Sequence, residues 1–207
     1  MARPAHANPH ESRRRLLDIA LREFAQHGYH AVSVRWLTAS AKINLAMVNH
    51  YFGNKRGLYD AAVDEVYRRL RERAAEVMAG TTLVDIDVLF EKLYGIGRAE
   101  RDGVRLLVRQ VVDHGRLNEH TEVKYFIPEI ENATRMTAEL IGVAPAQART
   151  AAVTLGYLLS RFVIQDDRSL VAALGARNVK DAHARVVATL AATARALFGT
   201  PHLKKKD

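Results

Sequence analysis

The chain has 207 residues, of which 48% are hydrophobic and 26% charged, a balance typical of a globular protein that buries a core. It contains no cysteine, which excludes disulfides and thiolate metal sites and fits a reducing compartment. No stretch at the amino terminus is typical of a signal peptide, and no run approaches the roughly 18 apolar residues of a membrane span. We therefore expect a cytoplasmic protein with no membrane partner.

The net charge of +8 is unevenly distributed along the chain. Residues 1–56 hold nine Lys or Arg against three Asp or Glu, whereas residues 57–207 hold 22 against 20. A localised positive field attracts a polyanion such as nucleic acid or an anionic membrane surface. Charge alone leaves open the alternative that this segment is only a soluble basic surface.

The first predicted helix begins near Ser12, which is expected to serve as its N-cap. Its apolar positions follow the spacing of one helix face, with Leu17, Ala20, Leu21 and Phe24 at i, i+3, i+4 and i+7. Gly28 follows the end of this pattern, where a left-handed C-cap residue is expected.

Two short helices and a long one are predicted next. Ser33 is a suitable N-cap for the segment VRWLTASA, and Asn44 is one for LAMVNHYF. A tight turn at Lys42 and Ile43 joins the two short segments. Lys55 begins a long helix that extends to about residue 79.

Five further helices are predicted beyond residue 80, at roughly 83–100, 104–117, 122–141, 146–165 and 179–198. The expected breaks are Gly103, the region of Asn118, residues 143–145 and residues 166–177. Pro145 suits the first turn of its helix, and Pro128 predicts a kink or a late start of the helix around it. No convincing strand pattern occurs, so we expect an all-α fold.

The segment from Ser33 to Phe52 is typical of a helix-turn-helix unit, in which the second short helix lies in the major groove. Val48 and Phe52, with Ile43, are expected to pack inward. The other side chains of this helix face outward or sideways, and an asparagine there is able to pair with adenine. A polar surface helix that only happens to carry aromatic residues is the alternative.

These residues resemble the DNA-binding domain of TetR-family transcriptional regulators. The resemblance rests on an Arg-rich start, Phe24 followed by Gly28-Tyr29, Ser33-Val34-Arg35, and the closing run HYFGNKRGL at residues 50–58. It implies a three-helix DNA-binding domain at residues 1–57 and a helical ligand-binding and dimerisation domain at 58–207. The helix at about 55–79 would connect the two domains.

The resemblance implies three groups of DNA contacts, to a double-stranded operator. The flanking backbone would be contacted by Arg13, Arg14 and Arg15, and the first short helix would contribute Ser33 and Arg35. The second short helix and its flanks would contribute Asn44, Leu45, Ala46, Met47, Asn49, His50, Tyr51 and Lys55. Lys42 in the preceding turn is a further DNA-binding candidate, which the resemblance does not imply. We expect Asn49 and Arg35 to read bases, and His50 and Tyr51 mainly to hold phosphates.

Three residues depart from the usual family pattern. Asn49 replaces a frequent tyrosine, which affects the expected base preference but not the docking mode. Lys42 stands where glycine is usual, which predicts either a strained left-handed lysine or an altered turn in which Lys42 reaches a phosphate. Trp36 stands where a smaller or charged residue is commoner, and its indole is expected to be partly exposed.

The last two long helices have apolar stripes too broad for a helix with one solvated face. By the resemblance, two such helices from each subunit form a four-helix homodimer interface. The residues expected there are Ala152, Leu155, Leu159, Phe162, Val187, Leu190 and Ala194. A purely intramolecular core is the alternative.

The middle helices carry polar groups among apolar ones, and the family resemblance implies a cavity there for a small-molecule effector. The candidate ligand-binding residues are Tyr94, Arg98, Arg109, Asp113, Tyr125, Tyr157 and Arg161. Arg109 and Asp113 are also spaced for a surface ion pair. Buried arginines would favour an anionic or carbonyl-rich effector.

Enzyme and metal motifs are missing from the sequence. It has no HExxH, no GxSxG and no GK[ST] ending to the glycine-rich run at 53–57, so we expect no enzyme activity, cofactor or metal. The expected function is a ligand-responsive, dimeric DNA-binding repressor with a palindromic operator. The alternatives are an activator or ligand-independent regulator, and a helical carrier or enzyme with an incidental basic N-terminus.

Overall fold

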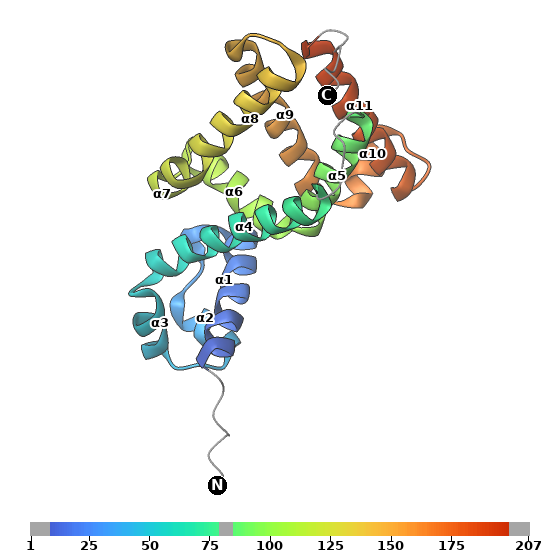
Figure 1. The fold of residues 1–207 in the computed structure, drawn as a ribbon. Coiled ribbons are helices and arrows are strands. Elements are labelled where there is room, and N and C mark those ends of the chain that lie inside the picture. Colours follow the sequence, from blue (N-terminus) through green and yellow to red (C-terminus); the bar gives the residue numbers. More distant parts are fainter. Residues whose placement is uncertain (1–8, 79–84, 199–207) are drawn as a thin grey trace. The chain divides into compact units, whose positions relative to one another are not determined.

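A computed structural model describes residues 9–78 and 85–198, and within these ranges the regular elements are all helices. Figure 1 shows them in chain order. Their bounds are α1 Pro9–Ala31, α2 Val34–Ala41, α3 Leu45–Phe52, α4 Lys55–Met78, α5 Ile86–Ala99, α6 Arg101–His114, α7 Glu119–Thr121, the π-helix η1 Glu122–Phe126, α8 Ile127–Ile141, α9 Pro145–Ile164, α10 Asp167–Leu174 and α11 Val179–Phe198. The prediction of an all-α fold is confirmed.

The helices pack as two compact units. The N-terminal unit contains residues up to 69 together with 102–121, and the C-terminal unit contains 70–101 and the residues from 122 onward. The N-terminal unit thus includes most of α6, which the expected domain of residues 1–57 does not. The functional boundary near residue 57 remains a prediction.

The core of the N-terminal unit forms around the apolar stripe of α1. Phe24 is fully buried, and its ring meets that of Tyr59 on α4 edge to face, with centroids 5.1 Å apart. Leu106 of α6 is also buried, and Asp18 of α1 forms an ion pair with Arg69 of α4. Each buried large apolar side chain stabilises the fold by about 1.5–3 kcal/mol.

The C-terminal unit is held together by α11. This helix packs against α5, α9 and α10, and α8 packs against α9. The buried stripe of α11 consists of Ala182, Val186, Leu190, Ala191 and Ala194. Gly97 lets α5 lie close to α9, because a Cβ there would be only 2.6 Å from Cγ2 of Val163.

The expected break at residues 166–177 is wrong in part, because it contains helix α10. Asp166 caps this helix by accepting hydrogen bonds from the backbone N–H and hydroxyl of Ser169, at 2.9 and 2.7 Å. Leu170 is its only buried residue, and Gly175 ends it with φ 58°. An aspartate is typical both of loops and of N-caps, so the residue that starts this helix also favours a break in the sequence.

Two expected helix ends are also wrong. Ser12 does not cap α1, since it lies inside the helix and is buried. Gly103 does not separate α5 from α6, since the break falls at Glu100 and α6 begins at Arg101. Gly103 is instead buried against Val66, whose Cγ1 would be 2.9 Å from an added Cβ.

The two prolines behave as their positions predict. Pro145 begins α9, and Pro128 is the second residue of α8, which starts late, at Ile127. The preceding residues 122–126 form the π-helix rather than a further α-helical turn.

Two glycines on α5 provide a matched test of this packing. We expect Gly97→Ala to lower the free energy of unfolding by about 1–3 kcal/mol, because the new methyl group would overlap Val163. Gly95→Ala should raise it by about 0.5–1 kcal/mol, because nothing lies within 4 Å of its added Cβ and alanine favours the helix. Urea denaturation measures both, and equal effects would contradict the close α5–α9 packing.

Candidate nucleic-acid interface

Helix α2 begins with the N-cap that the sequence predicts. The Ser33 hydroxyl accepts a hydrogen bond from the backbone N–H of Trp36 at 3.1 Å. Leu37 and Ala41 are fully buried, while Arg35 is exposed and Trp36 is 43% exposed with its indole against the His27 ring. The prediction of a partly exposed indole at Trp36 is confirmed.

The turn after α2 contains a strained lysine. Lys42 adopts φ 53° and ψ 47°, the left-handed conformation expected where glycine is usual. Its backbone N–H donates to Ala39 O at 3.1 Å, and that of Ile43 donates to Thr38 O at 3.0 Å. The Cβ of Lys42 costs about 1 kcal/mol in this conformation.

Helix α3 has one buried side and one exposed side. Asn44 caps it, with Oδ1 accepting from the N–H of Ala46 at 3.0 Å, and Val48 is almost fully buried. The outer face carries the exposed side chains of Leu45, Ala46, Asn49 and His50, with Met47 and Tyr51 half-buried. This is the exposed face that the sequence predicts.

A close backbone approach fixes the end of α3 against the start of α4. Asn54 Oδ1 accepts from the N–H of Gly57 at 2.9 Å, and an added Cβ on Gly57 would lie 2.0 Å from Phe52 O. Lys55 lies with Nζ 4.4 Å from the centroid of the Tyr29 ring, and burial lowers the pKa of this ammonium group. Lys55, which is expected to hold a phosphate, therefore lies over the Tyr29 ring of α1.

The helix-turn-helix segment has no negative side chains. Residues 24–59 contain no Asp or Glu, but they contain Arg35, Lys42, Lys55 and Arg56. Arg13, Arg14 and Arg15 are exposed on α1, and Arg13 lies over the Phe52 ring at 5.1 Å. Such a surface suits a polyanion.

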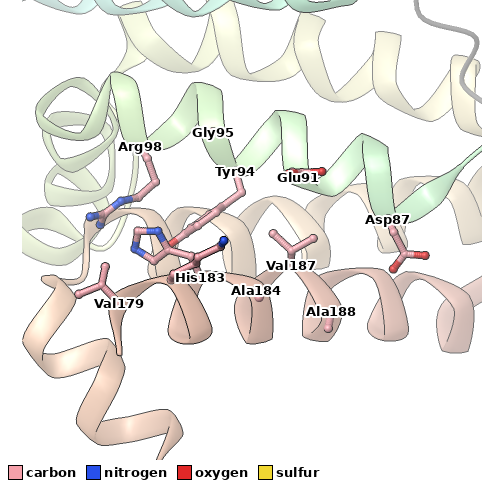
Figure 2. A pocket seen from close by; sticks show the side chains of 11 residues that line it. Asp87, Glu91, Tyr94, Gly95, Arg98, Val179, His183, Ala184, Val187 and Ala188 are labelled. Atoms are coloured by element: carbon pink, nitrogen blue, oxygen red, sulfur yellow. The ribbon is translucent and has the colours of Figure 1, made fainter. Parts of the chain in front are cut away.

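The expected ligand-binding residues lie in different places. Tyr94 and Arg98 line a groove between α5 and α11 in the C-terminal unit, which Figure 2 shows. Arg109 and Asp113 instead belong to the N-terminal unit, where Arg109 donates to Gln26 O at 2.9 Å and pairs with Asp113 at 3.1 Å.

The remaining three candidates do not line that groove. Tyr125 is buried and lies 5.3 Å from the guanidinium of Arg71, whereas Tyr157 and Arg161 are exposed on α9. The groove also contains Glu91, Lys180 and His183, which sequence reasoning missed. No local motif identifies them, because the two helices are far apart in the sequence.

The expected dimer residues fall into two groups. Leu155, Leu190 and Ala194 are buried within the subunit itself, whereas Ala152, Leu159, Phe162 and Val187 are half-buried. The second group is the one with surface left to contact a partner.

Residues 9–78 and 85–198 contain neither a cluster of metal-binding side chains nor a membrane-spanning helix. No three His, Asp or Glu side chains gather as a metal site there. None of the helices in these ranges is long and apolar enough to cross a membrane.

An exposed, acid-free α3 held by α2 and α4 defines a helix-turn-helix unit of the DNA-binding class. Residues 16–62 match the bacterial regulatory proteins of the tetR family. A segment of 86 residues, 42% of this chain, is 34% identical to the HTH-type transcriptional repressor AcnR of Corynebacterium glutamicum. That segment spans 44% of AcnR, less than half of its length.

The fold of the whole chain is similar to that of solved TetR-like regulators. One from Rhodococcus sp. RHA1 has a TM-score of 0.65 and 21% identity over 94% of this chain and 100% of that one. A TetR-family regulator from Streptomyces coelicolor has a TM-score of 0.66 and 19% identity over 91% and 95%. By these matches the chain resembles TetR-family regulators, in sequence over residues 16–62 and in fold over most of the rest. The relatives named here are described as regulators and not as enzymes, which supports the expectation of a non-enzyme.

Substitutions at Lys42 can separate the effect of its strained backbone on protein stability from a contribution of its side chain to phosphate binding. We expect Lys42→Gly to raise the free energy of unfolding by about 1 kcal/mol, because glycine adopts the left-handed conformation without a Cβ clash. If Lys42 holds a phosphate, the same change should reduce the slope of log K against log salt by about one. Urea denaturation and salt titration of DNA binding measure the two effects.

Lys42→Asn is the control for this prediction, because asparagine also tolerates the left-handed conformation but carries no charge. Lys42→Asn should reduce the slope of log K against log salt as much as Lys42→Gly does, but it should raise the free energy of unfolding by less. An unchanged salt slope in both variants would mean that Lys42 does not hold a phosphate.

Proposed function

We propose that this protein is a ligand-responsive repressor that binds a palindromic operator as a homodimer and is released by a small molecule. The observation that carries the DNA-binding part is the exposed face of α3, which lies within a 36-residue segment that lacks carboxylates, residues 24–59. The name of AcnR, a transcriptional repressor, supports repression rather than activation.

The side chains proposed to read bases are available for that role. Within the described part of the chain, the Asn49 and Arg35 side chains are exposed and have no hydrogen-bond partner. A carboxamide pairs bidentately with adenine, and a guanidinium pairs bidentately with guanine. Asn44 differs, because its Oδ1 already caps α3, so only its Nδ2 remains to donate to a phosphate.

The proposed phosphate contacts surround this reading face. His50 and Tyr51 lie at the end of α3 with their rings 5.1 Å apart, and Lys55 begins α4. Ser33 is the N-cap of α2, where the positive end of the helix favours a phosphate. Arg13, Arg14 and Arg15 extend the positive surface along α1.

The homodimer is proposed because one eight-residue helix reads too few base pairs for a specific site. The four half-buried residues Ala152, Leu159, Phe162 and Val187 on α9 and α11 would form its contact surface. Two copies would then present their α3 helices to two half-sites, about 34 Å or a multiple of that apart.

Binding to a DNA duplex of random sequence distinguishes a DNA-binding regulator from a carrier whose basic N-terminus is incidental. A DNA-binding regulator should bind such a duplex weakly, with an affinity that falls steeply between about 50 and 200 mM salt. Fluorescence anisotropy of a labelled duplex measures this binding. No binding at low salt would favour the carrier.

Asn49→Ala tests the base-reading role. We expect the variant to lose about 1–3 kcal/mol of binding free energy with the duplexes that the wild type prefers. The loss should be much smaller with the other duplexes, because the lost contact is specific for one base. Affinities over a panel of duplex sequences measure this difference. Arg13→Ala is the control and should weaken every duplex about equally; the same uniform loss in Asn49→Ala would contradict base reading.

The homodimer has its own test in light scattering at micromolar concentration. The wild type should have twice the subunit mass of 23.1 kDa. Ala152→Arg should shift the protein toward the monomer, because it places a charge within the proposed apolar contact. Thr150→Arg, on an exposed position of the same helix, should remain a dimer. A monomeric wild type would contradict the proposal.

A further inference from the structure

The groove between α5 and α11 is large enough to hold a small molecule. Its volume is about 890 Å³, within the usual range for ligand sites. Figure 2 shows that Tyr94 extends from α5 toward α11, where Ala184 and Ala188 form an apolar wall. Glu91 and Lys180 also line the groove, and both are exposed.

Tyr94 contributes a buried polar atom without a partner. The residue is 3% exposed, and its hydroxyl has no hydrogen-bond partner in the part of the chain that the structure describes. A buried hydroxyl that has lost its water without gaining another partner costs about 1–3 kcal/mol. Burial also raises the pKa of the Tyr94 phenol, so the group stays protonated and able to donate.

The Tyr94 ring is held in place by its neighbours, so its hydroxyl is not simply misplaced. It meets the His183 ring edge to face, with centroids 5.5 Å apart. His183 Nε2 lies 3.1 Å from Oδ1 of Asp167, which also accepts from Arg98 Nη2 at 2.5 Å. The ring thus lies against a network of polar groups that bond to one another and not to the hydroxyl.

Arg98 does not offer its charge to a ligand. Besides its bond to Asp167, it donates to the carbonyl oxygens of Val163 and Gln165, at 3.1 and 2.9 Å. The charge of Arg98, which is half-buried and on which the expectation of an anionic effector rests, is therefore neutralised by the protein itself. At the groove, the negative charge of Glu91 offsets the positive charge of Lys180, so the lining has no net attraction for an anion. An uncharged ligand with an acceptor oxygen fits the groove better.

We propose that the α5–α11 groove binds an uncharged, mostly apolar molecule with a carbonyl oxygen, and that the Tyr94 hydroxyl donates a hydrogen bond to that oxygen. The apolar wall receives the body of the molecule, and the acceptor satisfies the one buried donor that lacks a partner in the groove's described lining. That this ligand is also the effector rests on the function proposed above; the binding site does not.

The test uses the full-length protein without DNA, so its result does not depend on the proposed function. The probe is the fluorescent ketone 6-propionyl-2-(dimethylamino)naphthalene, and 2-(dimethylamino)naphthalene is its analogue without the carbonyl group. We expect Tyr94→Phe to bind the ketone about fivefold more weakly, because one hydrogen bond is lost. The affinity for the analogue should remain unchanged or increase.

Two further variants locate the probe. Ala184→Trp should lower the affinity for both compounds, because the indole fills the groove from an exposed position of α11. Tyr157→Phe, at an exposed tyrosine outside the groove, should change neither affinity. An unaffected Ala184→Trp variant would place the probe elsewhere and overturn the proposal, as would a wild type that does not bind the ketone up to its solubility limit.

Thermal denaturation of the unliganded protein provides an independent readout. Tyr94→Phe should melt at the same temperature as the wild type or higher, because it removes a buried group that has no partner. A lower melting temperature would show that the hydroxyl has a structural role, and the proposal would be wrong. An equal loss of affinity for the ketone and for its analogue in Tyr94→Phe would also overturn the proposal. The lost affinity would then not come from a hydrogen bond to the carbonyl oxygen.

Discussion

The exposed face of α3, which we propose reads DNA, depends on the burial of the opposite side of this helix. Val48 is almost fully buried, and the left-handed turn at Lys42 sets the direction in which the chain enters the helix. Because the inner side is packed, the outer side chains have a defined orientation, which base recognition requires. At the other end, the absence of a side chain on Gly57 allows Phe52 O to approach α4. A lysine in a strained conformation is tolerated because these contacts determine the turn around it.

The N-terminal unit extends beyond the three helices that resemble a DNA-binding domain. Leu106 of α6 adds to its core, Gly103 packs on Val66, and Arg109 holds the backbone of α1 at Gln26. The chain leaves the N-terminal unit at residues 69–70, returns to it at 101–102 and leaves it again at 121–122. A change in α6 would therefore act directly on the support of the reading helices, without passing through their outer face.

Local signals predicted most helices, whereas long-range packing decided the errors. Ser33 and Asn44 cap their helices as expected, since an N-cap needs only residues close in sequence. Gly103 was misread as a break because its role is to approach Val66, which is distant in sequence. Sequence alone indicates Tyr94 and Arg98 as ligand candidates, but not that His183 of α11 lies beside Tyr94, because the two helices are distant in sequence. The neutralisation of Arg98 by Asp167 and two carbonyl groups is long-range for the same reason. The outer face of α3 was predictable because a helical period alone places its side chains.

The most direct test is selection of binding sites from a random duplex pool with the purified protein, followed by sequencing. We expect an enriched inverted repeat, with two half-sites whose separation reflects the spacing of two α3 helices. The same selection with Asn49→Ala should lose the preference at one position of each half-site. Failure to enrich any site at low salt would contradict the central claim that α3 reads DNA sequence in a dimer.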